Sequence, residues 1–183
     1  MYEKEIEIPE NCRAEVTGNT VKIAGEKGQL ERVFKVYGIK IELKDKKIKV
    51  SSESEKRKAK ALVGTIIAHI RNMIYGVTKG YTYKLRVVYS HFPVTIKVDD
   101  ANKRVLIQNF LGEKTPRIAK IVGDTKVAVD GADIIVTGID VESVAQTSSN
   151  LELATKIKEH DRKVFQDGIY LVSKERPKIG VGE

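Results

Sequence analysis

The sequence contains a single cysteine, Cys12. One cysteine excludes an intrachain disulfide and any zinc site built from several thiolates, and it fits a reducing compartment. The apolar stretches are far shorter than the roughly 20 residues that a membrane-spanning helix needs, and residues 1–10 lack the apolar core of a signal peptide. The sequence therefore predicts a cytoplasmic protein with no membrane partner.

Motifs for catalysis are also missing. The three histidines, His69, His91 and His160, lie far apart, and none belongs to a metal-binding spacing such as HExxH. Neither a GxSxG nucleophile elbow nor a GxGxxG loop is present. Residues 112–115 resemble a phosphate-binding loop only faintly, because the lysine does not directly follow the glycine and Pro116 stands where a helix should run. We expect no enzyme activity, no catalytic residue, no metal site and no cofactor.

Negative charge is in deficit. The chain has 33 Lys and Arg residues against 25 Asp and Glu residues, a formal net charge of +8. Such an excess favours polyanionic partners, nucleic acid before an anionic membrane surface, and a merely basic cytosolic protein is the alternative. Residues 156–178 hold seven Lys or Arg residues and four Asp or Glu residues. This basic segment near the C-terminus also contains a phenylalanine and a tyrosine.

The first half of the chain reads as short strands followed by a helix. Residues 6–51 are expected to form short strands, and residues 39–43 and 48–50 alternate apolar and polar side chains, which is typical of strands with one buried face. Hairpin turns are expected at Gly18-Asn19 and at residues 44–47. These strands precede a change of period near residue 54.

Apolar residues from residue 54 to 75 recur at intervals of three and four, which predicts one amphipathic helix. Ser52 and Ser54 are candidate caps for its start, and Gly76 is a candidate end. Residues 56–58, Lys-Arg-Lys, begin its outer face, and we interpret them as a solvated helix face.

The second half repeats this pattern. Residues 81–89 alternate tyrosine and aliphatic residues with polar ones, which predicts a long strand that bridges two domains, with its tyrosines half-buried rather than stacked on bases.

Asp130-Gly131 predicts a type I′ hairpin turn. A helix is expected over residues 141–158. Within it, residues 146–150 are poor helix formers whose small size allows close approach of either the protein's own sheet or RNA.

An internal duplication organises the chain. Residues 41–50 align with residues 127–136 at a constant offset of 86 positions, turn included. The fold class is therefore predicted to be α+β, with two tandem copies of a small domain that has a mainly antiparallel sheet and one helix. The expected domains are residues 1–80 and residues 81–183, and the basic segment belongs to the second.

The C-terminal segment carries a family resemblance. Gln146, Leu151, Ala154, residues 156–158 and residues 161–171 (DRKVFQDGIYL) closely resemble the C-terminal signature of the large-subunit ribosomal protein six family, in its archaeal and eukaryotic form. The resemblance covers nearly the whole chain. Proteins of this family have two tandem copies of one α+β domain.

The resemblance implies a non-catalytic constituent of the large ribosomal subunit. In this family the C-terminal domain is the main part that binds large-subunit rRNA, near the sarcin–ricin loop and the landing site of translational GTPases and beside neighbouring ribosomal proteins. A free-standing, non-ribosomal RNA-binding adaptor that has borrowed the duplicated domain is the alternative. Co-sedimentation with the large subunit distinguishes the two.

The site residues follow from the resemblance and from the charge. Cationic side chains bind phosphates and release counterions, and arginine can form two hydrogen bonds to one phosphate. The residues predicted to bind rRNA are Lys156, Lys158, Arg162, Lys163, Lys174, Arg176 and Lys178.

Four further residues are predicted to shape the segment or to stack on bases. Phe165 and Tyr170 are interpreted as apolar anchors, with stacking on unpaired bases as the alternative. We expect Asp167 to form a turn through its own backbone, and Gly168 to allow a tight turn and a close approach of the backbone to RNA.

Overall fold

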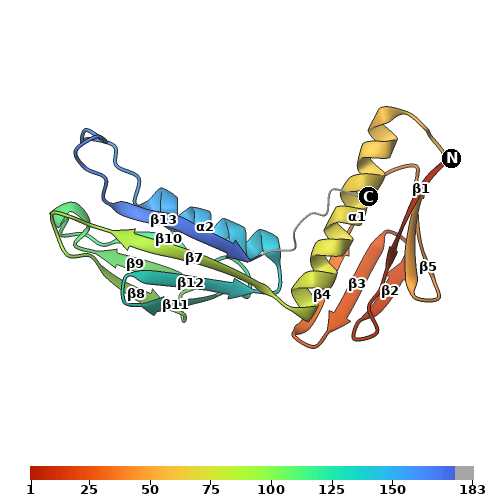
Figure 1. Ribbon diagram of the computed structural model, residues 1–183, viewed down its shortest axis with the longest axis horizontal. Helices are drawn as coiled ribbons and strands as arrows, with labels where there is room; N and C mark the ends of the chain where they lie inside the picture. The colour runs from red at the N-terminus through yellow and green to blue at the C-terminus, as the bar shows by residue number, and fades with distance from the viewer. Residues whose placement is uncertain (176–183) are drawn as a thin grey trace. The chain divides into compact units, whose positions relative to one another are not determined.

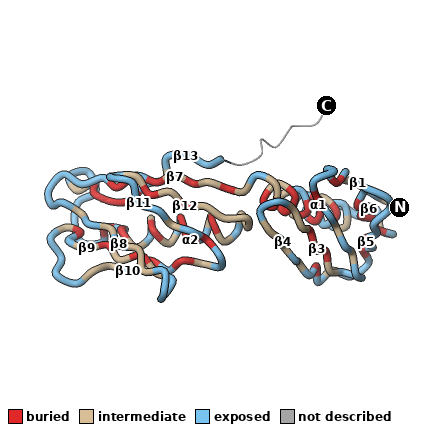
Figure 2. Tube along the Cα trace, turned by 90° about the horizontal axis from the view of Figure 1, so that it is seen from below, coloured by how far each residue is buried: buried red, intermediate tan, exposed pale blue. Residues whose placement is uncertain are grey.

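The computed structural model describes residues 1–175, and the chain divides into two compact units, Met1–Gly80 and Tyr81–Glu183 (Figure 1). Each unit contains two antiparallel sheets and one α-helix among its described residues. The predicted α+β class and the tandem repeat are therefore confirmed. Buried positions, red in Figure 2, recur along the strands and helices of both units.

The first unit has six strands and one helix among its described residues. One sheet has the order β1-β6-β5, and the other has the order β2-β3-β4. Helix α1 packs against β1, β3, β4 and β6, and the core lies between the helix and the two sheets. The elements are β1 (Tyr2–Glu7), β2 (Arg13–Thr17), β3 (Thr20–Gly25), β4 (Gly28–Val33), β5 (Ile39–Lys44), β6 (Lys47–Ser52) and α1 (Arg57–Thr78).

Helix α1 begins and ends later than the sequence predicts. Lys56 has an extended backbone and occupies the N-cap position of the helix. No side chain makes a capping hydrogen bond there, so neither Ser52 nor Ser54 acts as the expected cap. Ser54 Oγ instead accepts a hydrogen bond from the Lys56 N–H at 3.4 Å. Gly76, the predicted end, lies inside the helix and is buried. The chain leaves the helix at Gly80, whose φ of +76° is the left-handed conformation that glycine adopts readily.

The second unit has seven strands, one α-helix and a short 3-10 turn among its described residues. One sheet has the order β10-β9-β8, and the other has the order β11-β12-β7-β13. The elements are β7 (Tyr81–Val88), β8 (Thr95–Asp99), β9 (Arg104–Gln108), η1 (Phe110–Gly112), β10 (Arg117–Lys120), β11 (Lys126–Asp130), β12 (Asp133–Gly138), α2 (Val141–Ala154) and β13 (Gly168–Glu175).

Strand β7 does not bridge the two units, so that expectation is wrong. It lies wholly in the second unit, between β12 and β13. Tyr81 and Tyr83 are only 1% and 4% exposed. Their side chains are core residues rather than half-buried ones, because β7 is an inner strand whose one face is covered by α2.

Strand pairing shows how the two copies correspond. Tyr2 pairs with Ser52 in the first unit, and Tyr81 pairs with Gly138 in the second. Ser52 and Gly138 are 86 positions apart, so β1-β6-β5 corresponds to β7-β12-β11. Strand β13 adds a fourth strand on the remaining edge of β7. Within residues 1–175, no strand occupies the matching edge of β1.

The β11–β12 hairpin differs from its predicted form by one residue. Asp130 pairs with Asp133, so the two central turn residues are Gly131 and Ala132 rather than Asp130 and Gly131. Gly131 has a φ of +59°, and Ala132 has no positive φ. A type I′ turn needs positive φ at both central positions, so this pattern is that of a type II′ turn.

Small residues bring α2 close to its own sheets. Asp140 caps the helix by accepting hydrogen bonds from the N–H groups of Glu142 and Ser143. Thr147 is buried, and its Oγ1 accepts a hydrogen bond from the Val122 N–H at 3.0 Å. Ser148 is buried as well. The small side chains of residues 147 and 148 therefore serve intramolecular packing, which decides the question that the sequence left open for these two positions.

Helix α2 ends at Ala154, four residues before its predicted end. Arg117 holds this end: its Nη1 donates to the carbonyl oxygens of Ala154 and Lys156 at 3.0 and 3.1 Å. Its Nε and Nη2 donate to the Glu113 carboxylate at 2.9 and 2.6 Å. The last carbonyls of a helix lack helical partners, and a cation there also complements the helix dipole. The chain after α2 consequently leaves in a fixed direction.

Two glycine-to-alanine changes in the first unit should have opposite effects on stability. A Cβ on Gly25 would lie 2.7 Å from the Val77 carbonyl oxygen, whereas a Cβ on Gly64 in α1 would meet nothing within 4 Å. We expect Gly25→Ala to destabilise by about 1–3 kcal/mol through overpacking. Gly64→Ala should stabilise by up to about 1 kcal/mol through helix propensity. Denaturant unfolding of the two variants measures both effects, and a Gly25→Ala variant at least as stable as the wild type would contradict the packing described for Gly25.

Replacement of Arg117 should lower stability in a pH-dependent way. The hydrogen bond from Arg117 holds the pKa of the Glu113 carboxyl below its usual value. The contribution of this pair is therefore present above the unfolded pKa of about 4.3 and is lost as pH falls through the lower folded pKa. Arg117→Gln should cost about 2 kcal/mol at pH 7, from the lost charge-assisted bonds to backbone carbonyls.

The two components can be separated by a second variant. Glu113→Gln removes the titrating group and leaves the carbonyl bonds of Arg117 in place. Thermal unfolding of both variants between pH 7 and pH 3 should show that each deficit relative to wild type shrinks in acid, and that the Arg117→Gln deficit persists in part. A deficit in Glu113→Gln that grows as pH falls would be incompatible with the lowered pKa.

Candidate nucleic-acid interface

The segment between α2 and β13, residues 155–167, is a loop anchored at both ends; we call it the C-terminal loop. At its start, the Thr155 hydroxyl is buried and donates to backbone carbonyls of the last turn of α2. The same oxygen accepts a hydrogen bond from the Ile169 N–H at 3.0 Å. Thr155 therefore ties the end of α2 directly to the beginning of β13.

At the far end of the loop, Asp167 is only 2% exposed. Its carboxylate accepts hydrogen bonds from Ser90 Oγ at 3.2 Å and the Ser90 N–H at 3.5 Å, and it lies 3.6 Å from His91 Nδ1. The expectation that Asp167 forms a turn through its own backbone is therefore wrong. A buried carboxylate needs polar partners, and here they come from the connection between β7 and β8.

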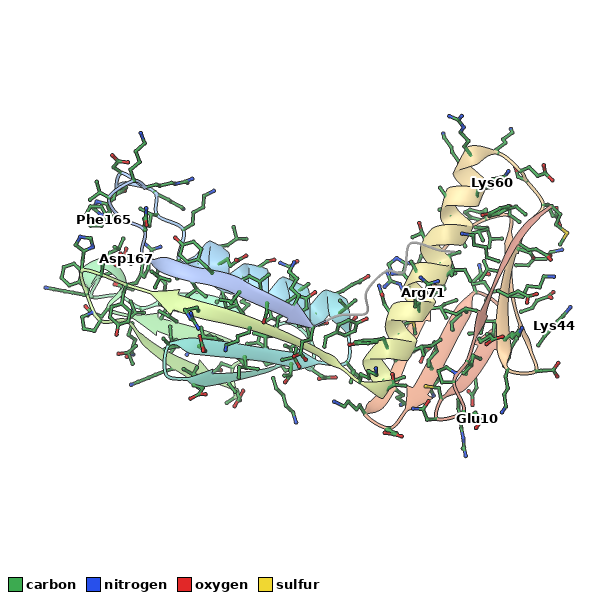
Figure 3. All side chains as sticks on the ribbon, viewed as in Figure 1. Glu10, Lys44, Lys60, Arg71, Phe165 and Asp167 are labelled. Carbon is green, nitrogen blue, oxygen red and sulfur yellow. The ribbon has the colours of Figure 1, made fainter. Side chains whose placement is uncertain are left out.

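Three aromatic rings pack together at the outer part of the loop. The Phe165 ring lies 4.7 Å from the His91 ring and 4.6 Å from the His160 ring, between centroids. Figure 3 shows Phe165 beside Asp167 at one end of the second unit. The sequence separates these histidines widely, and no spacing pattern pointed to this cluster. The ring of Phe165 is thus an anchor that already contacts two imidazole rings.

Tyr170 and Gly168 depend on each other. The Tyr170 hydroxyl donates to the Gln166 carbonyl oxygen at 2.9 Å. A Cβ on Gly168 would lie 3.3 Å from the Tyr170 ring. Gly168 is buried at the start of β13 and does not have a positive φ, so it forms neither the tight turn nor the exposed backbone that the sequence suggested. Because Gly168 has no side chain, the Tyr170 ring can pack directly against it.

Four cations of the C-terminal loop are exposed, and within residues 1–175 their side chains form no ion pair or hydrogen bond. These residues are Lys156, Lys158, Arg162 and Lys163. The lysines of the β5–β6 hairpin behave differently, because five of them lie within 2.7–3.9 Å of glutamate oxygens. Those five are Lys40, Lys44, Lys46, Lys47 and Lys49. These four cations therefore carry charge that no ion pair within residues 1–175 neutralises, while the exposed Glu159 and Asp161 lower the net charge of the same loop.

The structure does not bring the remaining predicted cations into this group. Lys174 is exposed near the other end of β13, with its Nζ 5.5 Å from the centre of the Tyr83 ring. In the antiparallel pairing of β13 with β7, Lys174 lies opposite Tyr83, whereas Gly168 lies opposite Val88. Five residues along a strand correspond to about 17 Å. Arg176 and Lys178 lie outside the described residues.

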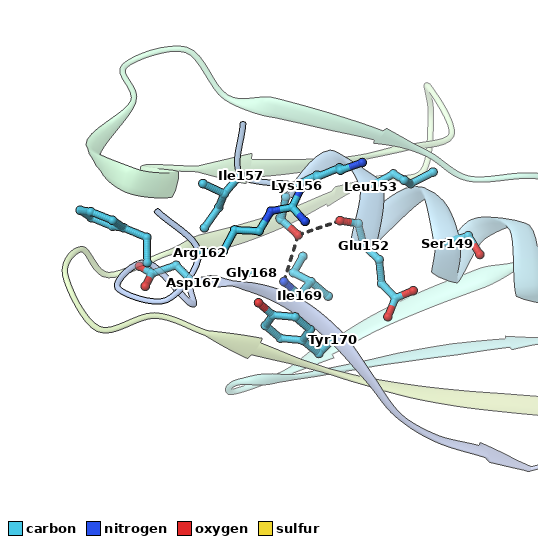
Figure 4. A pocket seen from close by; sticks show the side chains of 12 residues that line it. Ser149, Glu152, Leu153, Lys156, Ile157, Arg162, Asp167, Gly168, Ile169 and Tyr170 are labelled. Atoms are coloured by element: carbon cyan, nitrogen blue, oxygen red, sulfur yellow. Dashed lines mark hydrogen bonds between the residues drawn. The ribbon is translucent and has the colours of Figure 1, made fainter. Parts of the chain in front are cut away.

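An open groove of about 560 Å³ runs along α2, the C-terminal loop and the start of β13 (Figure 4). We call it the loop groove. Glu152 and Leu153 contribute to it from α2, Lys156 and Arg162 from the loop, and Tyr170 from β13. It therefore combines apolar side chains, a carboxylate and two of the unpaired cations.

Nothing in the described residues suggests catalysis. Among residues 1–175, no group of three or more His, Cys, Asp or Glu side chains is placed to hold a metal ion. Burial raises the pKa of the Cys12 thiol, which disfavours the reactive thiolate. Neither α1 nor α2 has the length and apolar composition of a membrane span. The features that remain are the charge and shape of the C-terminal loop.

Comparison with known proteins gives the family context for this loop. The family model described as ribosomal protein L6 matches the chain twice, over residues 8–80 and residues 92–168. Each match falls within one of the two compact units. The second match includes the whole C-terminal loop.

Relatives from archaea match over nearly the full length of the chain. The large ribosomal subunit protein uL6 of Staphylothermus marinus is 57% identical over 173 residues, which are 93% of each chain. The proteins of the same name from Desulfurococcus amylolyticus and Sulfurisphaera tokodaii are 51% and 50% identical, with 93% and 96% of this chain covered and 94% and 93% of theirs. Taken with the two family-model matches, these identities show that the chain belongs to the ribosomal protein L6 family.

Proposed function

We propose that this protein is a structural constituent of the large ribosomal subunit that binds large-subunit rRNA mainly through its C-terminal unit. The relatives carry the name of a large-subunit protein, and the family is one of structural proteins rather than enzymes. The ribosome is a cytoplasmic particle, which agrees with the location expected from the sequence.

The observation that carries the rRNA proposal is the group of unpaired cations on an anchored loop. Lys156, Lys158, Arg162 and Lys163 project from a segment whose ends are fixed by Thr155 and Asp167. A backbone segment that is anchored before binding has less backbone entropy to lose when its cations meet phosphates, and each phosphate contact releases counterions from the RNA. The loop is therefore preorganised for a polyanion.

Most contacts should be made to the RNA backbone. Double-stranded RNA hides its base edges in a deep, narrow groove, so proteins recognise it through phosphates, 2′-hydroxyls and groove shape. Contacts with neighbouring ribosomal proteins belong to the same proposal. So does the position that the family resemblance implies, near the sarcin–ricin loop and the site where translational GTPases land.

Removal of the loop cations should weaken rRNA binding more than removal of cations elsewhere. In filter-binding titrations, Lys158→Ala/Arg162→Ala/Lys163→Ala should lower the affinity and reduce the salt slope by about 2–3. The matched control replaces Lys56, Arg57 and Lys58 at the start of α1, which are equally exposed and carry the same charge.

Two outcomes would count against the proposal. Equal losses in the two triple variants would remove the assignment of rRNA binding to the C-terminal unit. A wild-type protein that washes off the large subunit in moderately high salt, as judged by co-sedimentation, would be an adaptor rather than a ribosomal constituent.

The anchoring role of Asp167 makes a prediction opposite to that of simple electrostatics. Asp167→Ala removes a negative charge near the loop, which by charge alone should strengthen RNA binding. We expect about a tenfold weaker affinity instead, because the loop loses its bond to Ser90 and must be ordered on binding. Asp167→Asn keeps an acceptor for Ser90 and should bind nearly as well as wild type. Tighter binding by Asp167→Ala in the same titration would refute the anchoring role.

A further inference from the structure

The loop groove has apolar walls that the fold leaves in contact with water. Leu153, on α2, is 63% exposed, and Tyr170, on β13, is 48% exposed, although both line the groove. Ile157 and Ile169 add buried apolar surface, at 7% and 2% exposure. Flat aromatic and aliphatic walls of this kind suit a planar ring. A volume of about 560 Å³ is within the range of small-ligand sites and holds one nucleotide.

Charged side chains of both signs line the loop groove. Lys156 and Arg162 line it without an intramolecular partner for their side chains, within residues 1–175. The Glu152 carboxylate also lines it, and its Oε1 accepts a hydrogen bond from the Leu171 N–H at 2.9 Å, which fixes its position. An ionised carboxylate only accepts hydrogen bonds. A ligand that brings negative charge for the cations and N–H donors for Glu152 therefore complements the groove.

We propose that the loop groove receives one unstacked nucleobase of the bound RNA, with the base between Leu153 and Tyr170 and the flanking phosphates on Lys156 and Arg162. This inference rests on the proposed rRNA binding and names the RNA element that the groove takes. A nucleotide combines a planar base, donor groups on the base edge and an anionic backbone in one ligand. Proteins commonly recognise RNA loops and bulges through bases splayed out in this way.

The carboxylate also sets an order of preference among bases. Guanine presents two adjacent donors, N1–H and the 2-amino group, which match the two oxygens of a carboxylate. Uracil places its single N–H between two carbonyl groups, which repel a carboxylate. The groove should consequently prefer guanine to uracil, and Glu152 is the residue that determines this specificity.

A single-tryptophan variant tests the proposal, because the chain contains no tryptophan. Leu153→Trp in the full-length chain puts an indole in the groove, and Leu62→Trp puts one at an exposed leucine of α1 as the control. The probes are a short oligouridine with one central guanosine, the all-uridine oligomer and an abasic ribose-phosphate oligomer of equal length. The guanosine oligomer should quench the Leu153→Trp indole and bind about tenfold more tightly than the abasic one, as expected for one stacked base. No probe should quench the Leu62→Trp indole.

The role of Glu152 has its own readout. Glu152→Gln keeps an acceptor for the Leu171 N–H, so the fold is preserved, but it replaces the carboxylate by an amide. The preference for the guanosine oligomer over the all-uridine one should fall about tenfold, while the salt slope of binding stays unchanged because no phosphate contact is lost. An unchanged base preference would remove Glu152 from recognition.

The outcomes separate this inference from the proposed function. Equal quenching by the abasic oligomer, or no quenching while the triple cation variant still loses RNA affinity, overturns the nucleobase site and leaves rRNA binding intact. Quenching by polyglutamate equal to that by the guanosine oligomer would make the groove an acidic-peptide site instead. Loss of cation-dependent RNA binding altogether would overturn the proposed function. If Leu153→Trp does not fold, NMR contacts between the Leu153 methyl groups and the guanine H8 proton in the wild-type chain decide the same question.

Discussion

The shape of the C-terminal loop depends on a carboxylate that has been taken out of water. Asp167 is almost fully buried, and a charge in that position is tolerated only where hydrogen bonds replace its hydration. Ser90 supplies those hydrogen bonds, and His91 Nδ1 lies 3.6 Å from the carboxylate, so the connection after β7 and the loop before β13 must keep one relative position. With Thr155 at the other end, the loop becomes a support of defined shape. The exposed cations gain their direction from that support.

Local periodicity explains why so much of the fold could be predicted. The alternation of the strands and the apolar stripe of α1 can be seen among residues close in the sequence. The offset of 86 positions reveals the duplication, and the family signature added the context of the C-terminal segment. Two of the errors come from contacts between residues far apart in the sequence. The end of α2 is set by Arg117, and the role of Asp167 by Ser90. The contact of the His91 ring with the Phe165 ring, which no sequence pattern indicated, is of the same kind. Such tertiary contacts leave no periodic trace in the sequence.

Residue type alone does not separate structural cations from those available to a ligand. Arg117 donates to Glu113 and to the backbone carbonyls of Ala154 and Lys156, with its guanidinium 4.5 Å from the centre of the Phe110 ring. Arg162 lies on the C-terminal loop with no such partner among the described residues. The same contrast holds between the paired lysines of the β5–β6 hairpin and the unpaired ones of the loop. Net charge therefore overstates the binding surface, and pairing identifies it.

The position of β13 has a consequence for how the chain acquires its structure during synthesis. Strand β7 pairs with β13, so residues 81–88 must wait for residues 168–175 before their sheet is complete. The first unit contains all its partners within residues 1–80 and can fold as soon as these emerge. The loop cations are then set in place when β13, the last strand of residues 1–175, is made. An incompletely synthesised chain would hold a folded first unit and an open sheet edge on β7, and such an edge can pair with a strand of another chain and promote aggregation.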